Sequence, residues 1–484
     1  MIMDINLLLP FAAYFCVLLA IGLFSHHRQT SAADFIVGNR SLNFWVTALS
    51  AHASDMSSWL FMAFPAAIYI GGLSQAWIAF GLILGMLMNW QFVAKKLRMS
   101  TEKYDSYTLS TFFEKRFNDN TGILRVLTAI VALFFLTCYV SAGLIAMGGI
   151  FESMFGINFY VGLTIASVVI LIYTFFGGFI TVAWTDLFQA LFLLCMIVIV
   201  PIAAYFTLEN GFSSILAAAE AKKISLDLIP DMSFDSFLAI IFLTLSWGLG
   251  YFGQPHIVTK FMGINNAENM KKSKYVGMIW QMTALSAAAA VGFVAIAYYG
   301  QGLENPERVF IEMVKSLFHP LAAGFILCGL LAASMSTIDS QILVCGSVCS
   351  EDLYKHIFRK HASPLELLAV SRLGVFLVSA ISLFFALSKN SSIQEAVLYA
   401  WSGLGCAFGP LVLMSLYSKS ANKYGAIAGV LVGGMVAGIW DEINVYFTDL
   451  AIPAMIPGFF LSLLSIYAVS KMTRGSTCQI ERSL

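Results

Sequence analysis

The chain consists largely of long apolar segments, and this feature restricts its possible folds more than any other. Each segment holds on the order of 20 residues, enough for a helix to cross the hydrocarbon core of a bilayer. A helix suits that environment because it satisfies its own backbone hydrogen bonds. The composition agrees, since 59% of the residues are hydrophobic and 11% are charged, whereas roughly a quarter are charged in a soluble domain. We predict an all-α polytopic membrane protein with about 13 transmembrane helices, at residues 5–25, 42–72, 74–95, 122–152, 158–182, 185–208, 236–263, 276–300, 314–348, 366–387, 393–417, 424–440 and 451–471.

The basic residues between these segments are distributed unevenly, which predicts an orientation. Cytoplasmic loops of membrane proteins carry an excess of Lys and Arg. If the N-terminus lies outside the cell, most of the loop Lys and Arg residues fall on the cytoplasmic side. The opposite side keeps only Lys222, Lys223, Arg308, Lys315 and Lys389. We therefore expect a multi-pass plasma-membrane protein with its N-terminus outside, its C-terminus in the cytoplasm and an odd number of spans.

Several other classes of protein are disfavoured by what the sequence lacks. The 27 basic and 27 acidic residues balance, so nothing points to a nucleic-acid partner. There is no phosphate-binding GxxxxGK[ST] loop, and the eight cysteines form no CxxC pair or Cys/His cluster. We expect a single membrane-embedded domain over residues 1–484, which is not an enzyme, has no organic cofactor and needs no obligatory protein partner. Residues 5–25 are expected to remain as a spanning helix, because they lack the basic start and cleavage site of a signal peptide.

Two of the predicted spans contain features that interrupt a helix. The second carries Asp55 within "SAHASDMSSW", where a charge costs at least a few kcal/mol and needs a purpose. The seventh carries Gly248, Gly250, Gly253 and Pro255 within "SWGLGYFGQPH", residues that weaken or break the helical hydrogen-bond ladder. Ordinary kinked helices are the alternative interpretation. A pair of interrupted spans, five apart, is however typical of transporters built from inverted repeats, which bind their substrates at the breaks.

A third segment supplies oxygen atoms for a cation. In "GLLAASMSTIDSQILVC", Ala333, Ser336 and Thr337 share one helix face because they stand at i, i+3 and i+4. Sodium, as a hard cation, prefers oxygen ligands. Carbonyls of Ala333 and of Ala53 and Met56 at the first break, with the two hydroxyls, would give five oxygens. Alternatively, the hydroxyls bond only to their own helix.

Long stretches of the chain resemble the sodium:solute symporter family, and in particular its proline-transporting members. The resemblance lies in "SLNFWVTALSAHASDMSSWL", "GGFITVAWTDLFQA", "SWGLGYFGQPHIVTKFM", "AASMSTIDSQILV" and "SEDLYK". It implies sodium-driven uptake of L-proline by alternating access, in a bacterial inner membrane. It also implies a five-plus-five inverted-repeat core, with broken helices at the second and seventh spans. The expected parts are an extra N-terminal helix (5–25), two five-helix repeats (42–208 and 236–417), two C-terminal helices (424–471) and a short cytoplasmic tail (473–484).

The resemblance also implies roles for individual residues. The sodium ligands of the family match Ala53, Met56, Ala333, Ser336 and Thr337, with Asp55 nearby. The proline site matches Ser57, Tyr139, Trp247, Tyr251 and Pro255. These residue types suit proline, because aromatic walls can pack its apolar ring while broken-helix ends meet its charged groups. Ordinary helix packing is the alternative role for Trp247 and Tyr251.

Some positions leave further questions. Family members with a second sodium site use the positions that match Asp186, Asp339 and Ser340, together with Ser336, so a second cation is one hypothesis for these residues. Asp186 could instead cap a helix N-terminus. The family motif usually has glycine at the positions of His52 and Ser58. Because histidine can gain or lose a proton near neutral pH and His52 lies close to Asp55 in the sequence, a role for His52 in binding a proton is a further hypothesis.

Three alternative functions are less well supported than proline uptake. A sodium symporter of the same fold could carry another amino acid, pantothenate, a monocarboxylate or a sugar, but should then replace the predicted proline-site residues. A membrane sensor would need a long cytoplasmic extension, which residues 473–484 do not provide. A channel would need a continuous polar lining, which the sparse charges within the spans do not support.

Overall fold

The computed structural model consists of helices joined by turns and loops, and it describes residues 5–25, 32–176, 178–300, 302–387, 392–447 and 452–474. Within these ranges the only β-type contact is an isolated bridge. The α-helices are α1 (Ile5–Ser25), α2 (Ala32–Val37), α3 (Phe44–Met56), α4 (Ala63–Gly71), α5 (Trp77–Met88), α6 (Lys95–Lys103), α7 (Leu109–Arg116), α8 (Ile123–Phe155), α9 (Phe159–Phe176), α10 (Phe179–Phe206), α11 (Phe212–Lys222), α12 (Phe234–Gly248), α13 (Pro255–Met262), α14 (Met270–Tyr298), α15 (Val309–Leu317), α16 (Pro320–Ser347), α17 (Pro364–Ala386), α18 (Ile393–Tyr417), α19 (Lys423–Phe447) and α20 (Met455–Met472).

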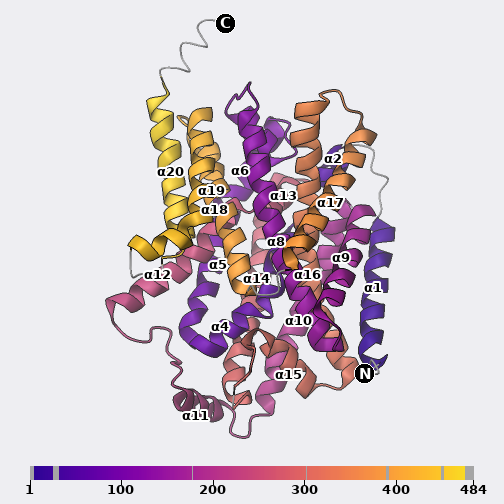
Figure 1. Ribbon diagram of the computed structural model, residues 1–484, viewed down its shortest axis with the longest axis vertical. Helices are drawn as coiled ribbons and strands as arrows, with labels where there is room; N and C mark the ends of the chain where they lie inside the picture. The colour runs from indigo at the N-terminus through magenta and orange to yellow at the C-terminus, as the bar shows by residue number, and fades with distance from the viewer. Residues whose placement is uncertain are drawn as a thin grey trace, which may run out of the picture.

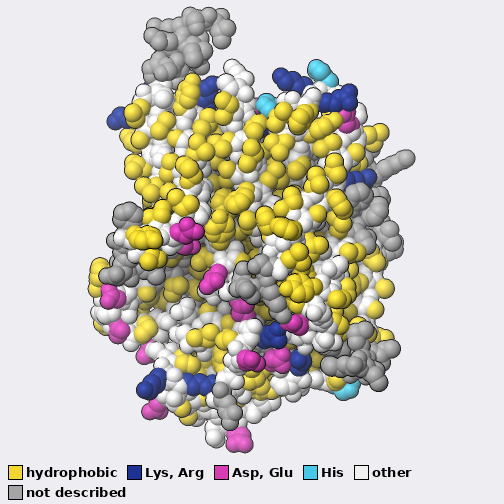
Figure 2. Space-filling model, viewed as in Figure 1, with side chains coloured by type: hydrophobic (Ala, Val, Ile, Leu, Met, Phe, Trp, Pro, Cys, Tyr) yellow, Lys and Arg dark blue, Asp and Glu magenta, His cyan; other side chains and the backbone are white. Residues whose placement is uncertain are grey.

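The helices form an elongated bundle whose surface suits a bilayer (Figure 1). Ten helices in the described ranges are long and apolar enough to cross a membrane, and three further apolar segments, Leu8–Ile21, Ser58–Gly71 and Phe159–Leu171, are shorter. Hydrophobic side chains cover most of the face in Figure 2, while Lys and Arg gather near its upper and lower ends. The first residues of α1 and the last of α20 lie at opposite ends of the molecule (Figure 1). The prediction of a multi-pass helical membrane protein is confirmed, while the count of 13 crossings stays a prediction.

Several predicted boundaries are wrong: the helical chain continues past the predicted ends of the third, ninth and twelfth spans, to Lys103, Phe358 and Phe447. Two further errors have a local cause. The fifth span was expected to reach residue 182, but α9 ends at Phe176 and α10 begins at Phe179. Gly178, with φ −176° and ψ −174°, is extended between them. The ninth span was expected from residue 314, but α15 ends at Leu317 and α16 begins with Pro320 in its first turn, a position where proline is favoured.

The second and seventh spans are broken, as the sequence predicts. In the second span, α3 ends at Met56, a short 3-10 turn covers Ser58–Leu60, and α4 begins at Ala63. In the seventh span, α12 continues into a 3-10 segment at Leu249–Gly253 before α13 begins at Pro255. The chain between these segments departs from helical geometry, so both spans expose backbone groups inside the bundle.

The glycines of the seventh span have a packing role that the sequence analysis missed. A Cβ atom on Gly250 would lie 2.0 Å from the Trp401 ring nitrogen, and one on Gly248 would lie 2.7 Å from the Gly81 carbonyl oxygen. Gly248 is still part of α12. These glycines therefore allow α5 and α18 to approach closely, and the actual break in the backbone lies later, at Gln254.

The two broken spans also touch each other directly. The backbone of Leu42, before α3, forms a parallel bridge with Ile264, after α13. Leu42 N donates to Gly263 O at 3.1 Å and Asn265 N donates to Leu42 O at 2.8 Å. The start of one broken span is thus joined to the end of the other, which places the two spans antiparallel within the core.

Candidate functional site

The first break leaves the end of α3 without its usual hydrogen-bond partners. Asn43 caps the start of α3 by accepting a hydrogen bond from Val46 N at 3.0 Å. The helix ends because Ser57 adopts φ 40° and ψ −173°, a backbone conformation that residues other than glycine rarely adopt. The last four carbonyls of a helix lack intrahelical partners. Those at the end of α3, which include Ala53 and Met56, are therefore free to accept other donors or a cation.

The predicted sodium ligands meet where α16 packs against the end of α3. Ser336 Oγ donates to the carbonyl oxygens of Ala53 at 2.8 Å and Ala333 at 3.1 Å. Thr337 Oγ1 lies 3.4 Å and 3.2 Å from the same two oxygens, and all four residues are buried. Met56, the remaining predicted ligand, is the buried last residue of α3. The structure thus brings carbonyl and hydroxyl oxygens together across 283 positions of sequence.

Asp55 joins the two broken spans. Its carboxylate accepts a short hydrogen bond from the hydroxyl of Tyr251, which lies in the 3-10 segment of the seventh span. Gln281 on α14 donates to the same hydroxyl at 2.9 Å, and Asn89 donates to the Tyr251 carbonyl at 3.0 Å. The buried carboxyl group of Asp55 therefore has a hydrogen-bond partner in the opposite break.

A small cavity lies beside Asp55, and aromatic rings form much of its wall. The ring centroids of Trp59 and Trp247 are 4.7 Å apart, and those of Trp247 and Trp401 are 6.2 Å apart. Three of the predicted proline-site residues are present, and the full lining is Asp55, Met56, Ser57, Trp59, Leu82, Tyr139, Trp247, Val397 and Trp401. The arrangement offers an apolar enclosure beside a carboxylate and a broken helix end.

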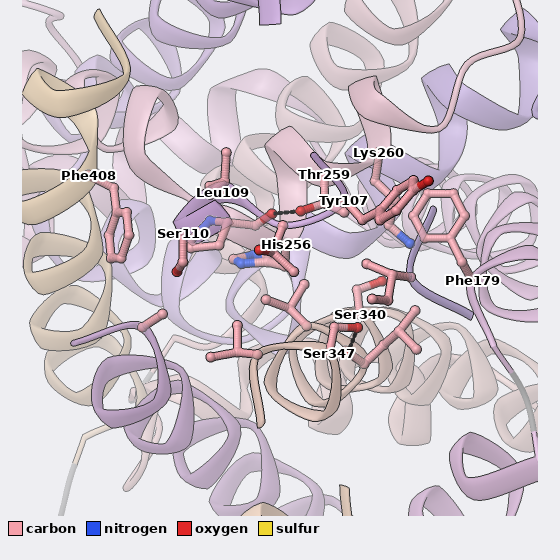
Figure 3. Close-up of a pocket in the computed structure, with 17 residues that line it drawn as sticks. Tyr107, Leu109, Ser110, Phe179, His256, Thr259, Lys260, Ser340, Ser347 and Phe408 are labelled. Carbon is pink, nitrogen blue, oxygen red and sulfur yellow. Dashed lines mark hydrogen bonds between the residues drawn. The ribbon is translucent and has the colours of Figure 1, made fainter. Parts of the chain in front are cut away.

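The other two predicted proline-site residues lie just outside this cavity. Tyr251 contacts the cavity through its hydrogen bond to Asp55. Pro255 opens α13 and lines a second, larger cavity toward α2 and the loop before α7 (Figure 3). His256 lines this larger cavity too, with its ring 5.8 Å from that of Tyr139. The larger cavity therefore lies next to the small one, on the side of the bundle where α2 and α7 lie.

A buried ion pair lies at the edge of the larger cavity. Lys260 Nζ on α13 donates to Asp186 Oδ2 on α10 at 2.9 Å, and the two side chains are 2% and 0% exposed. The same carboxylate oxygen accepts from Ser50 Oγ at 2.6 Å and from Ser340 Oγ at 3.4 Å. Sequence analysis placed Asp186 near the core but missed Lys260, which lies close to the end of the predicted seventh span, where a lysine side chain can also reach water.

The three residues of the second-cation hypothesis are not all in contact. Ser340 donates to Asp186, but Asp339 Oδ1 accepts from Thr174 on α9 at 2.9 Å. Consecutive residues of a helix point about 100° apart, so Asp339 and Ser340 face different neighbours. Asp186 lies within α10, seven positions after its first residue, so the alternative role of an N-terminal cap is wrong.

The two positions that depart from the family motif have separate surroundings. His52 Nε2 accepts a hydrogen bond from the indole N–H of Trp90 at 3.1 Å, and its ring packs between Trp90 and Trp280. An imidazolium has no lone pair with which to accept that bond, so this geometry favours a neutral histidine with a packing role. The Ser58 carbonyl accepts from Phe61 N and Met62 N and shapes the turn.

Several residues of the site were not predicted from the sequence. Trp59 lies in the quoted "SSWL" segment, so its position at the break could have suggested a role. Trp401, Gln281 and Asn89 lie far away in the sequence, on helices with no break, and only their tertiary contacts reveal them.

Comparisons with known proteins show which family the chain resembles. The model of the family described as "Sodium:solute symporter family" matches residues 35–433. The high-affinity proline transporter PutP of Bacillus subtilis (strain 168) is 43% identical over 461 residues, covering 94% of this chain and 96% of the relative. The sodium/proline symporter of Escherichia coli (strain K12) is 38% identical over 485 residues, covering 98% and 95%.

A solved structure shares the fold. It is a Na+-coupled sialic acid symporter in a substrate-bound outward-open state, with a TM-score of 0.81 and 21% sequence identity. The similarity covers 97% of this chain and 98% of that one. At this level of identity the match speaks for the fold alone.

Proposed function

The chain belongs to the sodium:solute symporter family, and on that premise we propose that it couples the inward movement of sodium to the uptake of L-proline. The observation that carries the coupling is the meeting of the Ala53 and Ala333 carbonyls with the Ser336 and Thr337 hydroxyls at the first break. The names of the similar proteins support proline as the solute. The family and these relatives are transporters rather than enzymes.

The proposed sodium ligands are the carbonyl oxygens of Ala53, Met56 and Ala333 and the hydroxyls of Ser336 and Thr337. Each hydroxyl can turn its hydrogen away and present a lone pair to an ion. Neutral oxygens hold sodium without the full charge of a carboxylate, which suits a carrier that must release the ion. Asp55 lies one residue from Met56, where its negative charge favours a nearby cation.

The proposed proline site uses Ser57, Tyr139, Trp247, Tyr251 and Pro255. The rings that line the small cavity can pack against the apolar ring of proline. The backbone groups exposed at the two breaks can meet its carboxylate and ammonium groups. Pro255 contributes by starting α13 at the break, since its ring lines the larger cavity instead.

The wider architecture supports transport by alternating access. We propose a five-plus-five inverted repeat over residues 42–208 and 236–417, flanked by residues 5–25 and 424–471. The antiparallel contact of the two broken spans fits that arrangement. With the N-terminus outside a bacterial inner membrane and the tail 473–484 inside, the larger cavity would lie on the cytoplasmic path of the solute.

The proposal is tested by uptake of radiolabelled L-proline into proteoliposomes that contain this protein alone. An inward sodium gradient should drive accumulation, and collapsing the gradient with a sodium ionophore should abolish it. Unlabelled proline should compete more strongly than other amino acids, pantothenate, monocarboxylates or sugars. Sodium-dependent uptake of a different solute would keep the coupling but replace proline. Accumulation of proline above its external concentration without a sodium gradient would reject the coupling.

The two sites should respond differently to mutation. Ser336→Ala removes a proposed sodium ligand and should raise the half-saturating sodium concentration more than that of proline. Trp247→Ala removes a wall of the small cavity and should raise the half-saturating proline concentration by roughly tenfold while changing that of sodium less, because burial of a large aromatic ring contributes more than about 1.4 kcal/mol. Equal effects of each variant on both concentrations would contradict this separation of roles.

A further inference from the structure

The packing of α16 against α3 creates two successive layers of polar groups. The first layer holds the Ala53 carbonyl with Ser336, and the second layer holds Ser50 and Ser340 around Asp186. Ser50 and Ala53 are three residues apart on α3, while Ser336 and Ser340 are four apart on α16. Each pair therefore occupies one helix face, and the layers lie about one turn, or roughly 6 Å, apart.

The second layer differs from the first because it contains a full negative charge. Asp186 is completely buried, and its Oδ2 atom is the shared acceptor for Ser50 and Ser340. Its other oxygen, Oδ1, is buried without a hydrogen-bond partner. A carboxylate with two hydroxyls supplies four oxygens, which is a suitable set for a hard monovalent cation.

A cation of the protein already contacts this layer. Lys260 Nζ lies 2.9 Å from Asp186 Oδ2, and the lysine side chain is only 2% exposed. It also lies over the ring of Phe179, at 5.3 Å from the centroid. Figure 3 shows Lys260, Phe179 and Ser340 around the same cavity. A lysine is rarely buried so completely unless its charge is paired, so the ammonium balances the charge of Asp186.

We propose that the Lys260 ammonium is a tethered substitute for a second sodium ion, so that this chain binds one sodium rather than two. The ammonium supplies the single positive charge that Asp186, Ser50 and Ser340 would otherwise take from solution. Because it is covalently attached, it contributes no ion gradient to transport. The inference rests on the proposed sodium coupling and specifies its stoichiometry.

Removal of the lysine charge should recreate an ion site. In Lys260→Met, the Asp186 carboxylate loses its partner, and leaving a buried charge unpaired is strongly unfavourable. Sodium from the adjacent cavity should then bind to Asp186 and the two hydroxyls. We expect the variant to bind one more sodium ion per chain than the wild type, and its sodium activation of uptake should become correspondingly steeper.

The test counts radiolabelled sodium bound to purified protein at saturating sodium, without proline. Lys260→Arg keeps the positive charge and should match the wild type. The double variant Lys260→Met with Asp186→Asn removes both charges and should return to the wild-type count. Lys260→Gln, whose amide can still donate to Asp186, separates the charge from the hydrogen bond and should bind the additional ion.

The outcomes distinguish this inference from the proposed function. Two sodium ions bound to the wild type, or no additional ion in both Lys260→Met and Lys260→Gln, would overturn the tethered-cation proposal. An additional ion in the double variant would place the new site elsewhere and also overturn it. If the wild type binds sodium but transports no proline, the proposed solute fails while the difference between wild type and variants still tests Lys260.

Discussion

The two broken spans reach similar shapes by different means. The first break has neither glycine nor proline at its turning residue, Ser57, whose backbone has a positive φ of 40°. Its freed groups are satisfied from elsewhere, since Ser57 N donates to Thr337 Oγ1 at 3.0 Å. The second break turns at Gln254, which is extended, and Pro255 begins the next helix. A proline at that position has no N–H to leave unsatisfied.

This difference indicates which break responds to the ion. At the second break, the Tyr251 carbonyl accepts from Asn89, and the Gln254 side chain donates to the Trp401 carbonyl at 3.1 Å, so these partners come from helices other than α16. The first depends on α16, the helix that also carries Ser336 and Thr337. A sodium ion at that contact would bind both sides of it at once. We therefore expect sodium binding to be coupled more strongly to the geometry of the first break than to that of the second.

The largest expected effect comes from Thr337→Val, which keeps the shape of the side chain but removes its hydroxyl. Ser57 N then loses its acceptor, and an unsatisfied buried N–H costs about 1–3 kcal/mol. A proposed sodium ligand is lost as well. We expect the half-saturating sodium concentration for uptake to rise by roughly tenfold or more.

The control for this variant is Thr337→Ser, which retains the hydroxyl and should transport with nearly the wild-type sodium requirement. Both variants are measured in proteoliposomes at equal protein content. If Thr337→Val and Thr337→Ser behave alike, the hydroxyl has no part in holding the first break.

An intermediate effect is expected from the strained residue itself. Ser57→Ala removes the hydroxyl that caps Trp59 N at 3.2 Å but keeps the unfavourable backbone conformation. Ser57→Gly also removes the hydroxyl, yet glycine adopts this conformation without steric cost. The glycine variant should therefore be more stable than the alanine variant by about 1 kcal/mol.

The comparison is made from the thermal unfolding midpoints of the two variants in the same detergent, each against the wild type. Both variants lack the hydroxyl, so its loss cancels between them. An alanine variant at least as stable as the glycine variant would show that the positive φ carries no strain.

The smallest effect is expected at the second break. Pro255→Ala leaves α13 with a residue that is also tolerated in the first turn, and the lost proline rigidity costs no more than about 1 kcal/mol. The half-saturating sodium concentration should change less than in Thr337→Val. A larger change in Pro255→Ala would reverse the contrast drawn between the two breaks.

Sequence patterns gave a good account of the features that depend on local composition. The apolar segments predict the helices, since length and hydropathy decide whether a segment can cross a bilayer. Some predicted helix boundaries are misplaced where short breaks interrupt continuous apolar sequence, as at Gly178 and before Pro320. The face shared by Ala333, Ser336 and Thr337 also follows from helical spacing alone.

The contacts across the bundle had no such local signature. Asp55 stood out in the sequence as a charge among apolar residues, but its partner Tyr251 lies 196 positions away. Lys260 lies near the end of the predicted seventh span, where a lysine side chain can reach water, yet it is buried against Asp186.

By itself, the sequence determined that the chain is a helical membrane protein with two interrupted spans and an oxygen-rich face on α16. These properties follow from composition and periodicity, which act over one helix at a time. Only the tertiary structure decided which groups meet: Asp55 with Tyr251, Thr337 with the turn at Ser57, and Lys260 with Asp186. Such pairs depend on the path of the whole chain, because buried polar groups must find partners wherever packing brings them together.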